Sequence, residues 1–136
     1  MSEAEIAYQI SETFNRIWSM QQWWASISVG MIVLAYVASE KLNTFLVTMV
    51  ISLYSAFSFY IFQLLGRNWE SIDGYITDLQ RLADTGQELA AGTLVYMQPQ
   101  NPIVVALIII TMFGTYAVCS AYLVYSYFRG KRTINA

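Results

Sequence analysis

Residues 44–65 read TFLVTMVISLYSAFSFYIFQLL, a run of apolar and uncharged side chains that decides the fold. A second uncharged run, IVVALIIITMFGTYAVCSAYLVYSYF, covers residues 103–128. A transmembrane helix needs about 20 mostly apolar residues to cross a hydrocarbon core of about 30 Å. A chain of 136 residues has no room for a soluble core that would enclose both runs. We therefore predict an all-α membrane protein with a single membrane domain over residues 1–136.

A third span is expected before these two. Residues 17–38 carry no charge, and the tryptophans at 23 and 24 open their most apolar part. Upstream, apolar residues at spacings of three and four predict an amphipathic helix over residues 1–22, continuous with this span. Only residues 39–43 separate it from the span at 44–65, and so short a connection favours an antiparallel hairpin. The prediction is three transmembrane helices at 17–38, 44–65 and 103–128.

The segment between the second and third spans, residues 66–101, contains another apolar stripe with an acidic face. It predicts an amphipathic helix over 69–90. This stripe and the N-terminal one emerge on the same side of the membrane, where their apolar residues would pair: Ile6, Ile10, Phe14, Ile72, Ile76 and Leu79. Leaving each such side chain in water would cost about 1.5–3 kcal/mol. The alternative is that both helices lie flat in the membrane interface.

Basic residues and aromatic residues indicate how the chain sits in the membrane. Four basic residues fall at the 39–43 turn and in the C-terminal tail, 129–136: Lys41, Arg129, Lys131 and Arg132. The positive-inside rule then places the C-terminus in the cytoplasm and the N-terminus outside, in a plasma or inner membrane. The amphipathic helices would accordingly be extracytoplasmic. Aromatic residues near the span ends are expected to anchor them at the interface: Trp23, Trp24, Trp69, Tyr122, Tyr125 and Tyr127.

Small and hydroxyl-bearing residues recur within the three spans: Ser26, Gly30, Thr48, Ser52, Ser55, Thr111, Gly114, Ala117 and Ala121. Small side chains allow helix backbones to approach closely in a membrane, so these positions predict helix–helix packing. The alternative is a hydroxyl-lined conduit for ions or water.

Composition narrows the function. Hydrophobic residues make up 57% of the chain, charged residues 12%, and the formal net charge is −2. There is no histidine, the single cysteine is Cys119, and no charged residue falls within a span. We therefore expect no enzymatic activity, no catalytic, metal or cofactor site, and no nucleic-acid partner.

The resulting functional prediction is a small membrane interaction or structural subunit. It would contact membrane lipid and pack by helix–helix contacts into a homo-oligomer or onto larger membrane-protein subunits. The alternative is a pore- or channel-forming homo-oligomer. In topology alone, the predicted arrangement resembles the three-span phage holins, which would imply such a pore.

Overall fold

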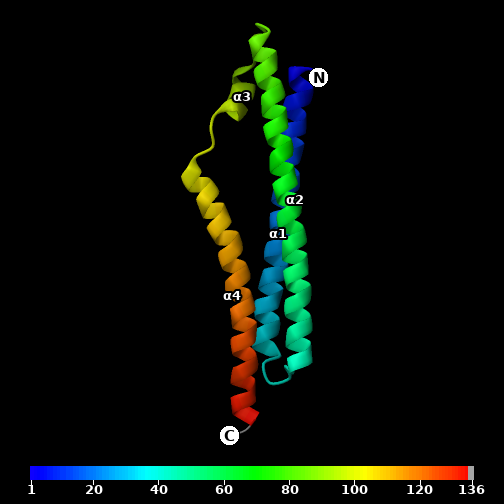
Figure 1. Ribbon diagram of the computed structural model, residues 1–136, viewed down its shortest axis with the longest axis vertical. Helices are drawn as coiled ribbons and strands as arrows, with labels where there is room; N and C mark the ends of the chain where they lie inside the picture. Colours follow the sequence, from blue (N-terminus) through cyan, green and yellow to red (C-terminus); the bar gives the residue numbers. More distant parts are fainter. Residues whose placement is uncertain (135–136) are drawn as a thin grey trace.

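The computed structural model describes the backbone of residues 1–134 and the side chains of residues 1–132. All regular structure in this range is helical: α1 (Glu3–Val37), α2 (Thr44–Asp84), α3 (Ala91–Leu94), the 3-10 turn η1 (Val95–Met97) and α4 (Pro102–Ile134). Figure 1 shows α1 and α2 side by side, with α4 beside them at its C-terminal end and diverging from them toward its N-terminal end. The predicted basic tail is helical as far as Ile134, and its residues 135–136 lie outside the described part of the chain.

Local capping explains where the long helices begin. Ser2 and Glu5 form a capping box: the Ser2 amide donates to Glu5 Oε2 (2.7 Å), and the Glu5 amide donates to Ser2 Oγ (3.3 Å). Such reciprocal bonds satisfy amides that a helix leaves without a partner at its first turn. Asn43 caps α2 by accepting the Leu46 amide at 2.8 Å. This cap fixes the start of α2 shortly after the end of α1 at Val37. Because the turn between them is short, α1 and α2 form an antiparallel hairpin.

α2 is a single helix of 41 residues, about 60 Å long at 1.5 Å per residue. It runs without a break through the region where the second span was expected to give way to a separate amphipathic helix. The predicted end of that helix at residue 90 is wrong, because α2 stops at Asp84. Gly86 follows with φ of 83°, in the left-handed region that favours glycine, and Thr85 Oγ1 donates to the Leu82 carbonyl at 2.6 Å.

Three clusters of buried apolar side chains follow one another along the hairpin, and each contains residues from both α1 and α2. The turn cluster lies nearest the 38–43 turn and includes Met31, Ala35, Val47, Tyr54 and Leu123. The middle cluster is built on Ile17, Trp24, Ile61, Leu65 and Ile72. The N-terminal cluster is built on Ile6, Ile10 and Leu79. α4 contributes to the turn and middle clusters only from Met112 onward, so its first turns lie outside the common core.

Within the described residues, two helices are long and apolar enough to cross a membrane: α2 and α4 as far as Arg132. α1 is long enough, but it is not among these two, because glutamines and serines interrupt its apolar part at Gln21, Gln22, Ser26 and Ser28. Only 6% of the most apolar 18-residue window of α4 is buried within the protein, and only 22% of that of α2. Core helices of a soluble protein would be mostly buried, and these are not.

Candidate interaction surfaces

The paired extension is the part of the hairpin formed by residues 3–16 of α1 and 69–84 of α2. Ile6, Ile10 and Leu79 are completely or almost completely buried there, at 1%, 0% and 0% exposure. Phe14 and Ile76 pack against them, and Ile72 is fully buried in the adjoining middle cluster. The structure thus places all six residues expected to pair at one continuous α1–α2 contact. The apolar stripes face each other, and the acidic residues between them lie on the outside.

The segment 91–97 covers one side of the paired extension, and the sequence alone did not predict this. Tyr96 of η1 stacks on Phe14 with ring centroids 6.4 Å apart, and Phe14 meets Trp69 edge-on at 5.8 Å. Phe14 therefore links a residue of α2 to a residue of η1. The available signal was the apolar run at 94–97, which includes Tyr96 and Met97 and precedes the polar linker 98–101.

A carboxylate ties this covering segment to the N-terminus. Glu3 Oε1 accepts the Ala90 amide at 2.8 Å, across 87 residues of chain. Hydrogen bonds from the Thr93 hydroxyl and the Ala90 amide hold the pKa of Glu3 below its ordinary value. A depressed pKa means that the ionised form is favoured in the folded state. The contact therefore stabilises the fold above the unfolded-state pKa and is lost as the pH falls through the folded-state pKa.

Acidification should accordingly release the segment 90–97. Hydrogen exchange of these amides is expected to be slow at neutral pH. After correction for the intrinsic rate, it should become faster as the pH falls below the ordinary pKa of a glutamate side chain and through the lowered pKa of Glu3. Glu3→Gln should show the faster exchange already at neutral pH, whereas Glu12→Gln, at an exposed position of the same helix, should behave like the wild type. Equal protection in Glu3→Gln and wild type at neutral pH would contradict this account of the tether.

Two hydrogen bonds between side chains join α1 to α2 in the middle of the hairpin. Trp24 Nε1 donates to Ser58 Oγ at 3.0 Å, and the Ser28 and Tyr54 hydroxyls lie 2.8 Å apart. Ser28 Oγ also donates its one proton to the Trp24 carbonyl at 2.9 Å, so Tyr54 is the donor in the second bond. The partners are four residues apart on each helix, which fixes the register of the antiparallel pair. All four side chains are buried.

α4 joins this network through Cys119. Its Sγ donates to the Ser28 carbonyl at 3.6 Å, and the residue is completely buried. Tyr116 of α4 stacks on Tyr54 at 5.5 Å and shares a hydrogen bond of 2.6 Å with Ser55. The three long helices therefore meet around Ser28 and Tyr54. Of the nine small or hydroxyl residues expected to mediate packing, Ser55 is the one that bonds a neighbouring helix in this network.

The other eight of those residues lie on the outer surface of the protein: Ser26, Gly30, Thr48, Ser52, Thr111, Gly114, Ala117 and Ala121 are all exposed. A side chain added at Gly30 or Gly114 would meet no atom within 4 Å. The side-chain hydrogen bonds and ring contacts among α1, α2 and α4 instead involve mainly Ser28, Ser58, Tyr54 and Tyr116, which are not among these nine residues. The eight positions remain available to a second molecule.

The aromatic residues expected at the interface divide into two groups. Trp23 and Tyr125 are exposed, at 71% and 59%, and Trp69 and Tyr122 are half-buried. Trp24 and Tyr127 differ from that expectation, because both are buried: Trp24 bonds Ser58, and Tyr127 shares a 2.7 Å hydrogen bond with Thr44. Their polar atoms find partners on α2 rather than at a membrane surface.

The four basic residues expected on the cytoplasmic side lie near the hairpin turn. Lys41 is in the turn itself, and Arg129, Lys131 and Arg132 are exposed on the last turns of α4. Lys131 Nζ sits 4.7 Å from the centroid of the Tyr127 ring, a cation–π distance. The acidic residues of the paired extension lie at the opposite end of the molecule (Figure 1).

Grooves run along both sides of α4 where it diverges from the hairpin. On the α1 side, one hollow of about 350 Å³ lies between Trp24 and Leu107, and another of about 390 Å³ lies between Ile32 and Gly114. Both are lined almost entirely by apolar side chains.

No family model, curated protein or solved structure matches this chain.

Proposed function

We propose that this protein is a small three-span membrane subunit that packs through α4 and its exposed small residues into a homo-oligomer or a larger membrane complex. The observation that carries the proposal is the first half of α4. Its large apolar residues point in all directions around the helix and are exposed: Ile103, Val104, Leu107, Ile109, Ile110 and Phe113. A helix that is hydrophobic all round belongs in lipid or against other helices.

The pairing of α1 with α2 supports a third span. α2 is about 60 Å long, roughly twice the hydrocarbon thickness, so its apolar half (residues 44–65) would cross and its other half would stand outside. α1 contacts that apolar half through Trp24–Ser58 and Ser28–Tyr54. A helix held side by side with a spanning helix at the same depth must cross as well. α1 has no charged residue between Arg16 and Glu40 to oppose this.

The orientation follows from the charges at the two ends. The paired extension, with an excess of carboxylates, would be extracytoplasmic, and the turn with the basic end of α4 would be cytoplasmic. In this placement the paired extension projects from the membrane as an acidic surface. Such a surface suits docking of a basic partner.

Thiol labelling tests the three spans and the orientation together. Cysteines replacing Glu12, Lys41 and Gln87, all exposed, would be treated in intact cells with a reagent that cannot cross membranes. We expect labelling at 12 and 87, labelling at 41 only after permeabilisation, and little background from the buried Cys119. Labelling of 12 and 41 from the same side would contradict a membrane-spanning α1, and the reverse pattern would contradict the orientation.

A pore is the second candidate function, and exposed hydroxyls on the outward face of α2, Thr48 and Ser52, are what favours it. The interior of the protomer opposes it, because Tyr54, Tyr116 and Trp24 fill the space between the helices. Dye-loaded liposomes containing the purified protein discriminate the two. The subunit proposal expects no leakage above empty liposomes, and size-selective leakage that increases with protein density would favour the pore.

A further inference from the structure

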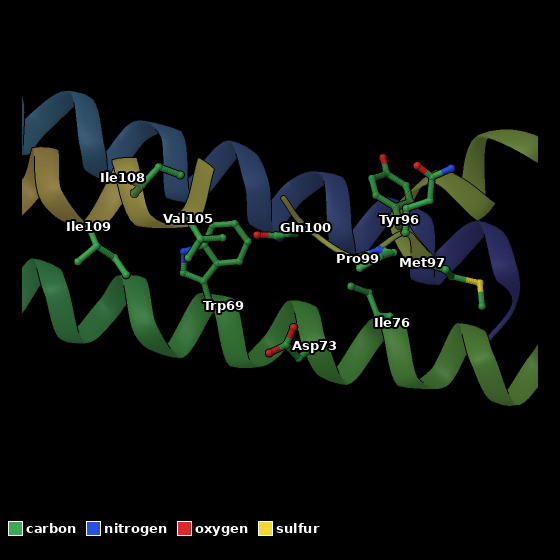
Figure 2. Close-up of a pocket in the computed structure, with 11 residues that line it drawn as sticks. Trp69, Asp73, Ile76, Tyr96, Met97, Pro99, Gln100, Val105, Ile108 and Ile109 are labelled. Carbon is green, nitrogen blue, oxygen red and sulfur yellow. The ribbon is translucent and has the colours of Figure 1, made fainter. Parts of the chain in front are cut away.

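A third cavity, of about 490 Å³, lies on the α2 side of the point where α4 diverges. Its walls come from the paired extension, the linker 98–100 and the first turns of α4 (Figure 2). Cavities of this volume bind small organic molecules in many proteins. Its lining is apolar at the α4 end and includes one charged group, at the α2 end.

Two aromatic rings line the cavity on the side of the paired extension. Trp69 comes from α2 and Tyr96 from η1, and both rings contact Phe14, at 5.8 and 6.4 Å between centroids. Phe14 packs with the N-terminal and middle clusters, so the two rings are held before any ligand arrives. Indole and phenol faces attract cations through the ring quadrupole, tryptophan most strongly.

Asp73 is the one charged residue that lines the cavity. In Figure 2 Asp73 lies on α2 between Trp69 and Ile76, with its carboxylate drawn against the α2 ribbon, and the residue is exposed. No ion pair joins it to a basic residue within residues 1–132, where Arg81 pairs with Asp78 instead. The cavity therefore presents a negative charge beside two aromatic rings, without a neutralising cation.

The opposite wall is aliphatic. Val105, Ile108 and Ile109 of α4 line the cavity at the end near Trp69, whereas Ile76 of α2 lies at the other end, beyond Asp73 (Figure 2). Val105 and Ile109 are exposed, so an alkyl chain can extend from the cavity along this wall. In the proposed membrane placement, that wall faces hydrocarbon. A ligand that fits both ends needs a cationic head and an apolar body.

We propose that this cavity binds an amphipathic ammonium compound, with Asp73 as counter-ion, Trp69 and Tyr96 against the cationic head, and the α4 isoleucines along the alkyl chain. The shared chemistry is an ammonium on a hydrocarbon chain, which either a lipid headgroup or a free amphiphile can supply. An anionic headgroup is disfavoured, because the lining residues include no lysine or arginine and do include a carboxylate. The lining residues all belong to one protomer, so the site does not require an oligomer, although it rests on the proposed membrane placement of α4.

Octyltrimethylammonium is the first probe, titrated calorimetrically into the purified protein in an uncharged detergent. Its neutral isostere, with carbon in place of the ammonium nitrogen, is the ligand control. We expect the ammonium to bind at least about threefold more tightly than the isostere, since only the ammonium can form an ion pair with Asp73 and cation–π contacts with the rings. Equal affinity for the two ligands would overturn the proposal.

Variants locate the effect in the cavity. Asp73→Asn removes the charge at nearly constant size and should weaken ammonium binding about threefold while leaving the isostere unchanged. Trp69→Leu should weaken the binding of octyltrimethylammonium by a similar factor. Glu70→Gln, an exposed carboxylate on the same helix that does not line the cavity, is the matched control and should bind like the wild type. An effect of Glu70→Gln equal to that of Asp73→Asn would mean general electrostatic attraction and would overturn the specific site.

A competition experiment between two lipids identifies the source of the ammonium. The protein is equilibrated with equal amounts of phosphatidylethanolamine and phosphatidylglycerol of identical acyl chains, and the retained lipid is counted by native mass spectrometry. Preferential retention of the ethanolamine lipid that Asp73→Asn abolishes indicates a lipid headgroup. Octyltrimethylammonium binding without lipid preference indicates a free amphiphile. Preferential, Asp73-independent retention of phosphatidylglycerol would contradict the cation site.

Discussion

Replacing Gly130 with alanine should loosen the C-terminal end of α4 from the hairpin turn and make Cys119 reactive. Gly130 is buried against the backbone of Ser39 and Glu40. A Cβ at this position would lie 2.8 Å from the Ser39 carbonyl carbon and closer still to its oxygen. The turn is short, and the amides of Lys41 and Leu42 donate to the Ala38 carbonyl, which limits the freedom of the backbone to move away. Either α4 shifts or the turn distorts.

The steric clash should lower the free energy of unfolding by about 1–3 kcal/mol, as at other overpacked sites. Replacing glycine by alanine in a helix raises the same free energy by up to about 1 kcal/mol, which offsets part of this loss. Cys119 reports the change, because it is completely buried between α4 and α1 and reacts only when they separate. The net destabilisation increases the fraction of molecules in which α4 has separated from α1. The rate at which Cys119 reacts with a small membrane-permeable thiol reagent should therefore rise by about tenfold.

Gly66→Ala is the matched control for this experiment. Gly66 lies inside α2, and a Cβ there would meet no atom within 4 Å. This substitution should leave Cys119 as unreactive as in the wild type and should slightly stabilise the helix. An unchanged Cys119 rate in Gly130→Ala would show that the contact between α4 and the turn does not hold the helices together.

Replacing Ile10 with aspartate should separate the paired extension while leaving the rest of the hairpin intact. Ile10 is fully buried in an apolar cluster with Ile6 and Leu79. Truncating a buried isoleucine lowers the stability by about 2–5 kcal/mol. The unpaired polar group of the aspartate adds a further cost, so the helix pairing should be destabilised by more than this amount. The remaining contacts in this region, mainly Ile6, Phe14, Ile76 and Leu79, are too few to restore the pairing.

Hydrogen exchange measured by mass spectrometry localises the effect. Amides in 3–16 and 69–84 should lose protection, whereas those in 24–37 and 44–61 should keep it, because the Trp24–Ser58 and Ser28–Tyr54 bonds hold that part of the hairpin. Tyr8→Asp places the same charge on the same helix at a position 65% exposed, and it should have no such effect. Retained protection in Ile10→Asp would contradict pairing, and would favour helices that lie separately on the membrane.

Helical character and the helix faces could be read from the sequence, because both follow from local patterns. The spacing of Ile6, Ile10 and Phe14 identifies one face, and that of Ile72, Ile76 and Leu79 identifies another. The continuity of α2 through Gly66 was harder to anticipate, since glycine beside arginine and asparagine is typical of a helix end. Asn68 removes the conflict by donating from Nδ2 to the Leu64 carbonyl at 2.7 Å within the helix.

The specific partners could not be predicted, because they depend on the register between helices. Trp23 and Trp24 are adjacent and chemically identical, yet only Trp24 faces α2 and finds Ser58. Likewise, Ser28 bonds Tyr54 whereas Ser26, two residues away, bonds only the carbonyl of Gln22 in its own helix. The need for glycine at 130 arises from the close approach of the 38–43 turn, which no local pattern encodes.

The most direct test of the proposed function is the mass of the protein extracted gently from its native membrane, with every co-purifying chain identified. We expect a single species, either a fixed multiple of 15.5 kDa or a complex with larger membrane proteins in constant proportion. Either result would show that the protein belongs to an assembly, as the exposed apolar surface of α4 predicts. A monomer of 15.5 kDa surrounded only by lipid would contradict the account.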